Sequence, residues 1–168
     1  MEIRTGRWAA THEDEIVVFL IGMRINKLWK VGKWLPVLWA MPKLLRWLDH
    51  HPQAGLLHHE YVAKSPLSPM VIQYWRSFEH LERFARSSGA PHMAAWKAFD
   101  AKIGDSGDVG IWHETYRVRP GMSESIFENM PPTGLGAAGE LAPIDARAAT
   151  AAKRLRRGAG NEPPVVAS

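Results

Sequence analysis

The chain has 168 residues, a formal net charge of +4 and an apolar content of 46%, values typical of one globular domain with a tail. It has no cysteine, which excludes disulfides, thiolate nucleophiles and cysteine metal ligands and suits the reducing cytoplasm where we expect the protein. Half of the net charge belongs to the residues after position 130, so the nearly balanced body argues against nucleic-acid binding. No stretch is apolar enough to span a membrane, and the N-terminus lacks a signal-peptide pattern.

Residues 1–13 are polar and predict a loose arm, with only Trp8 held in place. The run from Glu15 to Ile25 is continuously apolar and rich in Val and Ile, which is typical of a central strand buried on both faces. Gly22 within this run indicates a bulge or the close approach of another group.

The segment 26–51 is rich in tryptophan and predicts helix. Its apolar residues step by four, three, four and three, which places them on one helical face: Trp34, Leu38, Met41, Leu45 and Leu48. Pro36 suits a first turn, whereas Pro42 predicts a kink or two separate helices. The interspersed lysines also allow a helix lying on a membrane surface, although packing on a sheet is the favoured interpretation.

The remaining body alternates between strand and helix patterns. Residues 55–64 predict a strand with His59 and Tyr61 on one face and His58 and Glu60 on the other. A strand ending at Trp75, a helix capped by Ser77, a helix over 91–103 and a strand over 108–119 follow. The order β-α-β-β-α-β predicts an α+β, ferredoxin-like antiparallel sheet with helices on one face.

After Pro120 the pattern weakens. A short strand is expected at 125–127, and the Ala-, Gly- and Pro-rich residues 136–168 predict a mostly disordered basic tail. The predicted organisation is therefore an arm over 1–13, a ferredoxin-like domain over 14–135 and the tail.

Three titratable residues in or beside aromatic elements are candidates for catalysis. His92 opens a helix after a proline, where its imidazole could ligate haem iron or act as a base. His113 and Glu114 are adjacent in a strand, so they point to opposite faces and cannot form a dyad. Glu114 lies between Trp112 and Tyr116 on its face, and we expect it either to pair with Arg24 or to have a raised pKa.

Several segments together resemble a monooxygenase-like family whose named relative is a small oxidase of fumagillin biosynthesis: IVVFLIGMRINKLWKVGKWLP, VIQYWRSFEHLERFA, HMAAW, GIWHETYRV and ESIFENMPPTGL. The resemblance implies a homodimeric α+β barrel of the kind found in antibiotic-biosynthesis and haem-degrading monooxygenases and, more distantly, aldoxime dehydratases. It implies either haem, held by His92, or no cofactor at all. It also implies secondary metabolism as the setting.

Two interpretations follow. The first is an oxygen-using enzyme for a small hydrophobic substrate, with His92, His113 and Glu114 as catalytic residues. Its pocket is expected between helices and sheet, with these substrate-binding residues: Arg24, Trp34, Trp39, Tyr74, Trp75, Trp96 and Trp112. The second is a non-catalytic dimer that carries an apolar ligand or haem, because a fold alone does not prove catalysis.

Overall fold

The structure is a computed structural model that describes residues 2–87, 91–145 and 148–159. The chain divides into two compact units, which are described separately. Unit 1 comprises Met1–Ile16 and Arg117–Ser168, and unit 2 comprises Val17–Tyr116. None of the helices in the described ranges is both long enough and apolar enough to cross a membrane.

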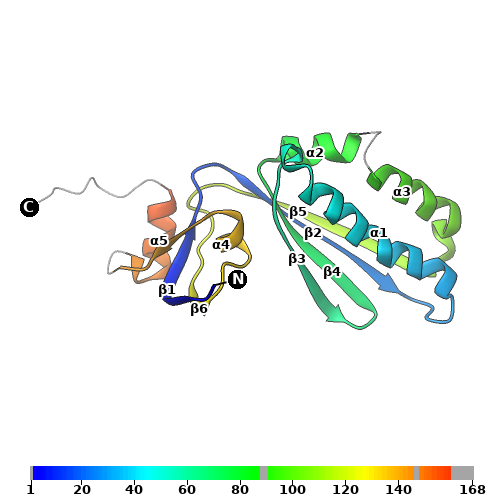
Figure 1. The fold of residues 1–168 in the computed structure, drawn as a ribbon, viewed down its shortest axis with the longest axis horizontal. Coiled ribbons are helices and arrows are strands. Elements are labelled where there is room, and N and C mark those ends of the chain that lie inside the picture. The colour runs from blue at the N-terminus through cyan, green and yellow to red at the C-terminus, as the bar shows by residue number, and fades with distance from the viewer. Residues whose placement is uncertain (1, 88–90, 146–147, 160–168) are drawn as a thin grey trace, which may run out of the picture. The chain divides into compact units, whose positions relative to one another are not determined.

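Unit 2 is built on a four-stranded sheet with the order β3-β4-β2-β5, with helices over one face (Figure 1). Its elements in chain order are β2 (Ile16–Ile25), α1 (Val31–Asp49), β3 (Leu56–Ser65), β4 (Ser68–Trp75), α2 (Phe78–Arg86), α3 (Pro91–Lys102) and β5 (Val109–Val118). The first residue of β2 and the last two residues of β5 fall outside the bounds of unit 2. The predicted β-α-β-β-α-β order and the ferredoxin-like sheet are confirmed.

Strand register decides which side chains meet the helices. In the antiparallel pair β2–β4, Val17 lies opposite Trp75 and Phe19 opposite Gln73, and in β3–β4 His59 lies opposite Gln73. Because side chains alternate along a strand, these residues share the face toward the helices. Their neighbours, including His58 and Tyr74, point to the face that carries no helix.

The helix α1 covers the core on one face of the sheet. Leu45 and Leu48 are buried with Met41 packed against their cluster, and Trp34 and Leu38 pack on a second cluster, so the predicted stripe is confirmed. Of the two alternatives predicted at Pro42, two separate helices are wrong, because α1 runs through both Pro36 and Pro42. Each proline removes one backbone hydrogen bond, and packing of the apolar face on the sheet outweighs that loss.

Two apolar clusters hold the helices on the sheet. One combines Val17, Val71 and Trp75 from strands with Leu45, Leu48 and Leu81 from α1 and α2. The other combines Met23, Ile25 and Val109 with Ile103 after α3. The predicted cap of α2 is confirmed, because the backbone N–H of His80 donates to Ser77 Oγ at 3.3 Å.

Unit 1 contains a three-stranded antiparallel sheet in which β1 (Arg4–Thr11) lies between β6 (Phe127–Met130) and β7 (Glu140–Pro143). Short helices α4 (Leu135–Ala138) and α5 (Ala151–Gly158) accompany it. The residues expected as a loose arm are thus a central strand, and residues 135–158 carry three elements where composition predicts disorder. The pairing partners lie more than 110 residues apart, so local patterns could not reveal them.

Candidate active site

A row of side chains crosses the helix-covered face of the unit 2 sheet, with one residue from each strand. We call it the helix-side row: His59 from β3, Gln73 from β4, Phe19 from β2 and His113 from β5. His59 and Phe19 are the cross-strand neighbours of Gln73, and the rings of Phe19 and His113 are 5.5 Å apart. Cross-strand neighbours on one face contact each other directly, so the row is continuous.

Gln73 is the polar centre of this row and is only 2% exposed. Its Oε1 accepts a hydrogen bond from Trp75 Nε1 at 2.9 Å, and its Nε2 lies 3.8 Å from the thioether sulfur of Met41 in α1. A thioether is a weak acceptor, so the amide N–H groups are poorly satisfied in an otherwise apolar interior. A buried amide in this state costs free energy, and it can donate to a polar atom of a bound molecule.

His59 lies at the edge of the row beside a carboxylate. Its Nδ1 is 3.6 Å from Oδ1 of Asp49, the last residue of α1, and its side chain is 21% exposed. The ring of Tyr61 meets it edge-on at 5.8 Å, and the pKa of Tyr61 is raised by burial and by the negative charge of Asp49. A carboxylate beside an imidazole orients the ring, and such a pair is an arrangement that general bases use.

The sequence did not single out Gln73, His59 or Asp49 as catalytic residues. The signal that was present is the position of His59 on the same strand face as Tyr61, which the alternation predicted correctly. The buried glutamine could not be recognised, because its burial depends on α1, which places Met41 over it, and its other partner is Trp75 of the same strand.

The predicted residues His113 and Glu114 do lie on opposite faces. His113 belongs to the helix-side row. Glu114 accepts a hydrogen bond from the hydroxyl of Tyr116, which raises the pKa of that tyrosine. The expected pair with Arg24 does not form, because Arg24 Nη1 lies 3.4 Å from Ser68 Oγ instead.

Strand register explains why Glu114 and Arg24 are apart. A Cβ on Gly110 would lie 3.9 Å from Arg24 Cβ, which places these two residues side by side on β5 and β2. Glu114 follows four residues later, about 13 Å along the strand.

The predicted aromatic walls do not meet in one pocket. Trp75 is fully buried in the core, and Trp34 packs on the second cluster while its Nε1 donates to the Leu28 carbonyl at 2.9 Å. Tyr74 and Trp112 face away from the helices, and Trp39 and Trp96 are 57% and 53% exposed. The side chain of His92, in the first turn of α3, lies outside the described residues.

The helix-free face carries a second polar cluster around Tyr74. His58 Nε2 lies 3.2 Å from Glu60 Oε1, and the His58 and Tyr74 rings are 6.1 Å apart. Burial raises the pKa of Tyr74, and the charge of Glu60 adds to this effect. The adjacent histidines of β3 therefore each meet a carboxylate, one on either face of the sheet.

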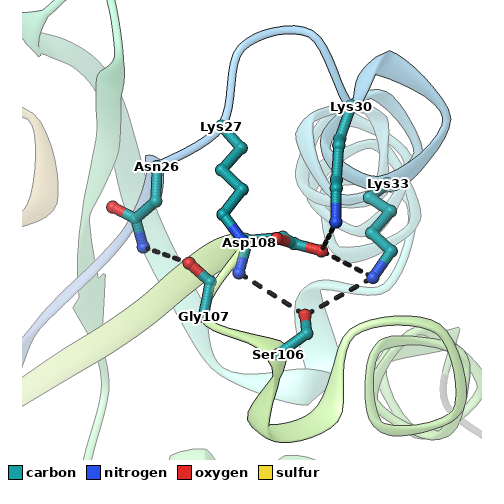
Figure 2. Close-up of polar contacts among 7 residues, drawn as sticks. All are labelled: Asn26, Lys27, Lys30, Lys33, Ser106, Gly107 and Asp108. Carbon is teal, nitrogen blue, oxygen red and sulfur yellow. Dashed lines mark hydrogen bonds and ion pairs between the residues drawn. The ribbon is translucent and has the colours of Figure 1, made fainter.

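Asp108 forms an ionic junction between β5 and α1 (Figure 2). It is fully buried, and its carboxylate lies 2.8 Å from Lys27, 2.9 Å from Lys30 and 2.6 Å from Lys33. These three lysines hold the pKa of Asp108 well below its usual range. The junction fixes the start of α1, because Lys30 immediately precedes that helix.

Haem does not fit the described helix–sheet interior. The side chains that fill this space are 0–1% exposed, among them Val17, Leu45, Leu48 and Trp75, and a macrocycle would have to displace them. A hollow of about 430 Å³ is lined instead by unit 1 residues that include Arg4, Trp8 and Pro132. Within the described ranges, no three His, Asp or Glu side chains are arranged to hold a metal ion.

Comparison with solved structures supports the fold. Over 92% of this chain and 42% of the other, it is similar to the aldoxime dehydratase OxdRE, solved in complex with butyraldoxime, with 17% identity and a TM-score of 0.61. A second aldoxime dehydratase matches 94% of this chain and 45% of its own, with 18% identity and a TM-score of 0.62. The chain thus spans less than half the length of these enzymes.

A smaller protein is matched over nearly its whole length. SnoaB, a cofactor-independent oxygenase from Streptomyces nogalater, matches 63% of this chain and 94% of its own, with 15% identity and a TM-score of 0.45. No curated protein matches the chain significantly. The model of the monooxygenase af470-like family matches residues 16–135, and the chain belongs to that family.

Proposed function

We propose that this protein is a monooxygenase that acts on a small hydrophobic substrate, which binds at the partly exposed His59 edge of the helix-side row. The buried amide of Gln73 carries the proposal, because it lies in an aromatic interior beside the His59–Asp49 pair. Membership of the monooxygenase-like family supports oxidative chemistry. The link to fumagillin-type secondary metabolism remains a prediction.

In the proposed reaction His59 removes a proton from an acidic C–H group of the substrate, and Asp49 stabilises the imidazolium that forms. Gln73 donates an N–H to the oxygen of the resulting enolate-type anion. The anion supplies the electrons that reduce O₂. A CH₂ group and O₂ become C=O and H₂O, so the balance requires no external reductant.

The test uses the full chain and a hydroxyanthrone, whose ring CH₂ group is acidic, while oxygen uptake is followed with an electrode. His59→Gln is expected to lower kcat by about 10² to 10⁴-fold, the usual contribution of a general base. His50→Gln is the matched control, since that imidazole is exposed and contacts only the Arg46 carbonyl among the described contacts, at 2.7 Å. Full activity of His59→Gln would refute the proposal, and tight binding without oxygen uptake would favour the ligand-carrying alternative.

We also propose that the helix-free face pairs with a second copy. Partly buried apolar residues of this face would be removed from water, among them Val18, Leu20, Ile72 and Val62. Light scattering at micromolar concentration should give twice the monomer mass. A monomer at that concentration would count against the assembly.

A further inference from the structure

The outer surface of α1 and the loop before it carry an exposed apolar strip. We call it the outer stripe: Leu28, Trp29, Val31, Leu35 and Trp39, which are 55%, 75%, 46%, 37% and 57% exposed. Val31, Leu35 and Trp39 recur at four-residue spacing and so lie along one line of the helix. Core residues such as Met41 and Leu48 lie on the side of the helix opposite Trp39, so α1 carries apolar residues on two sides.

Cations surround this stripe. Lys27, Lys30 and Lys33 converge on Asp108 at its N-terminal end, and one buried carboxylate leaves two positive charges uncompensated there (Figure 2). Lys43 and Arg46 continue the outer side of the helix after Trp39 and are exposed. The nearest acidic residues in sequence are Glu15 and Asp49, and Asp49 lies 3.6 Å from His59. Asp105 precedes Ser106, whose Oγ accepts a hydrogen bond from Lys33 at 3.5 Å.

We infer that the outer stripe binds a membrane surface that bears anionic phospholipid headgroups. Exposed tryptophans with aliphatic neighbours favour the boundary between headgroups and acyl chains. The flanking lysines and Arg46 are of one sign, which complements an anionic surface. The buried junction holds three of these cations in fixed positions, so little conformational freedom is lost on binding.

The test is cosedimentation of the full chain with vesicles of phosphatidylcholine alone or with 30% phosphatidylglycerol. We expect at least tenfold tighter binding to the anionic vesicles. Lys43→Gln with Arg46→Gln should weaken that binding by roughly 25-fold, from about fivefold per cation lost near a charged surface. Trp29→Ala with Trp39→Ala should weaken it by at least tenfold, because the interfacial anchors are removed.

Matched controls change the same residue types elsewhere in unit 2. Trp96→Ala on α3, and Lys64→Gln with Lys102→Gln, should leave binding within twofold of the unmodified chain. Equal binding to both vesicle types, or unchanged binding by the Trp29 and Trp39 variant, would overturn the inference. Absence of vesicle binding together with self-association that this variant abolishes would identify a second copy as the occupant instead.

Discussion

The buried hydrogen bond between Trp75 and Gln73 gives the sharpest test of the core beneath the candidate site. Gln73→Leu keeps a side chain of similar volume but leaves the fully buried indole N–H without its acceptor. An unsatisfied buried donor costs about 1–3 kcal/mol, and the gain from burying an apolar leucine offsets part of it. We expect a net loss of about 1–2 kcal/mol in the free energy of unfolding, or roughly 2–8 °C in Tm.

A double-mutant cycle separates the hydrogen bond from packing. Trp75→Phe should cost about 2 kcal/mol, because it removes ring volume and leaves the amide oxygen without its donor. The double variant should be about 1 kcal/mol more stable than the sum of the single losses predicts. Urea unfolding followed by far-UV circular dichroism measures all four proteins. Additive losses within about 0.3 kcal/mol, or a Gln73→Leu variant more stable than the parent, would refute the reasoning.

Three further predictions concern stability and titration. Since lysines depress the pKa of Asp108, its ionised form stabilises the fold above the ordinary carboxyl pKa of about 4, and that contribution falls at lower pH. Asp108→Asn should therefore be less stable near neutral pH, and its free energy of unfolding should fall less steeply as the pH is lowered. An unchanged dependence on acid pH would contradict this assignment. Gly22→Ala should destabilise the fold by about 1–3 kcal/mol, because its Cβ would lie 2.7 Å from Trp112 Nε1. Adding Trp112→Ala should recover part of this loss, and thermal unfolding that shows no recovery would disprove the contact. All three tyrosines have raised pKa values. Absorbance titration at 295 nm should therefore show a midpoint above 10 in the folded protein and near 10 in guanidinium chloride. Coincident titration curves would exclude these environments.

The sequence by itself determined the architecture of unit 2. The continuous Val- and Ile-rich run of β2 predicts a central strand, although the face without helices is only partly buried. The spacing of apolar residues in α1 predicts its core face. Both signals arise from burial of neighbouring residues in one element, so they are visible locally. Alternation along β3 likewise assigned His58 and His59 to opposite faces.

The tertiary structure alone decided which residues share a site. Gln73 becomes a candidate only because strand pairing places His59 and Phe19 on either side and α1 brings Met41 over it. The expected Arg24–Glu114 pair does not form because of the β2–β5 register. Arg24 lies beside Gly110, four residues before Glu114, so the two charged groups are separated along the strand. The sheet of unit 1 depends on contacts between the two ends of the chain, and no local periodicity encodes such contacts.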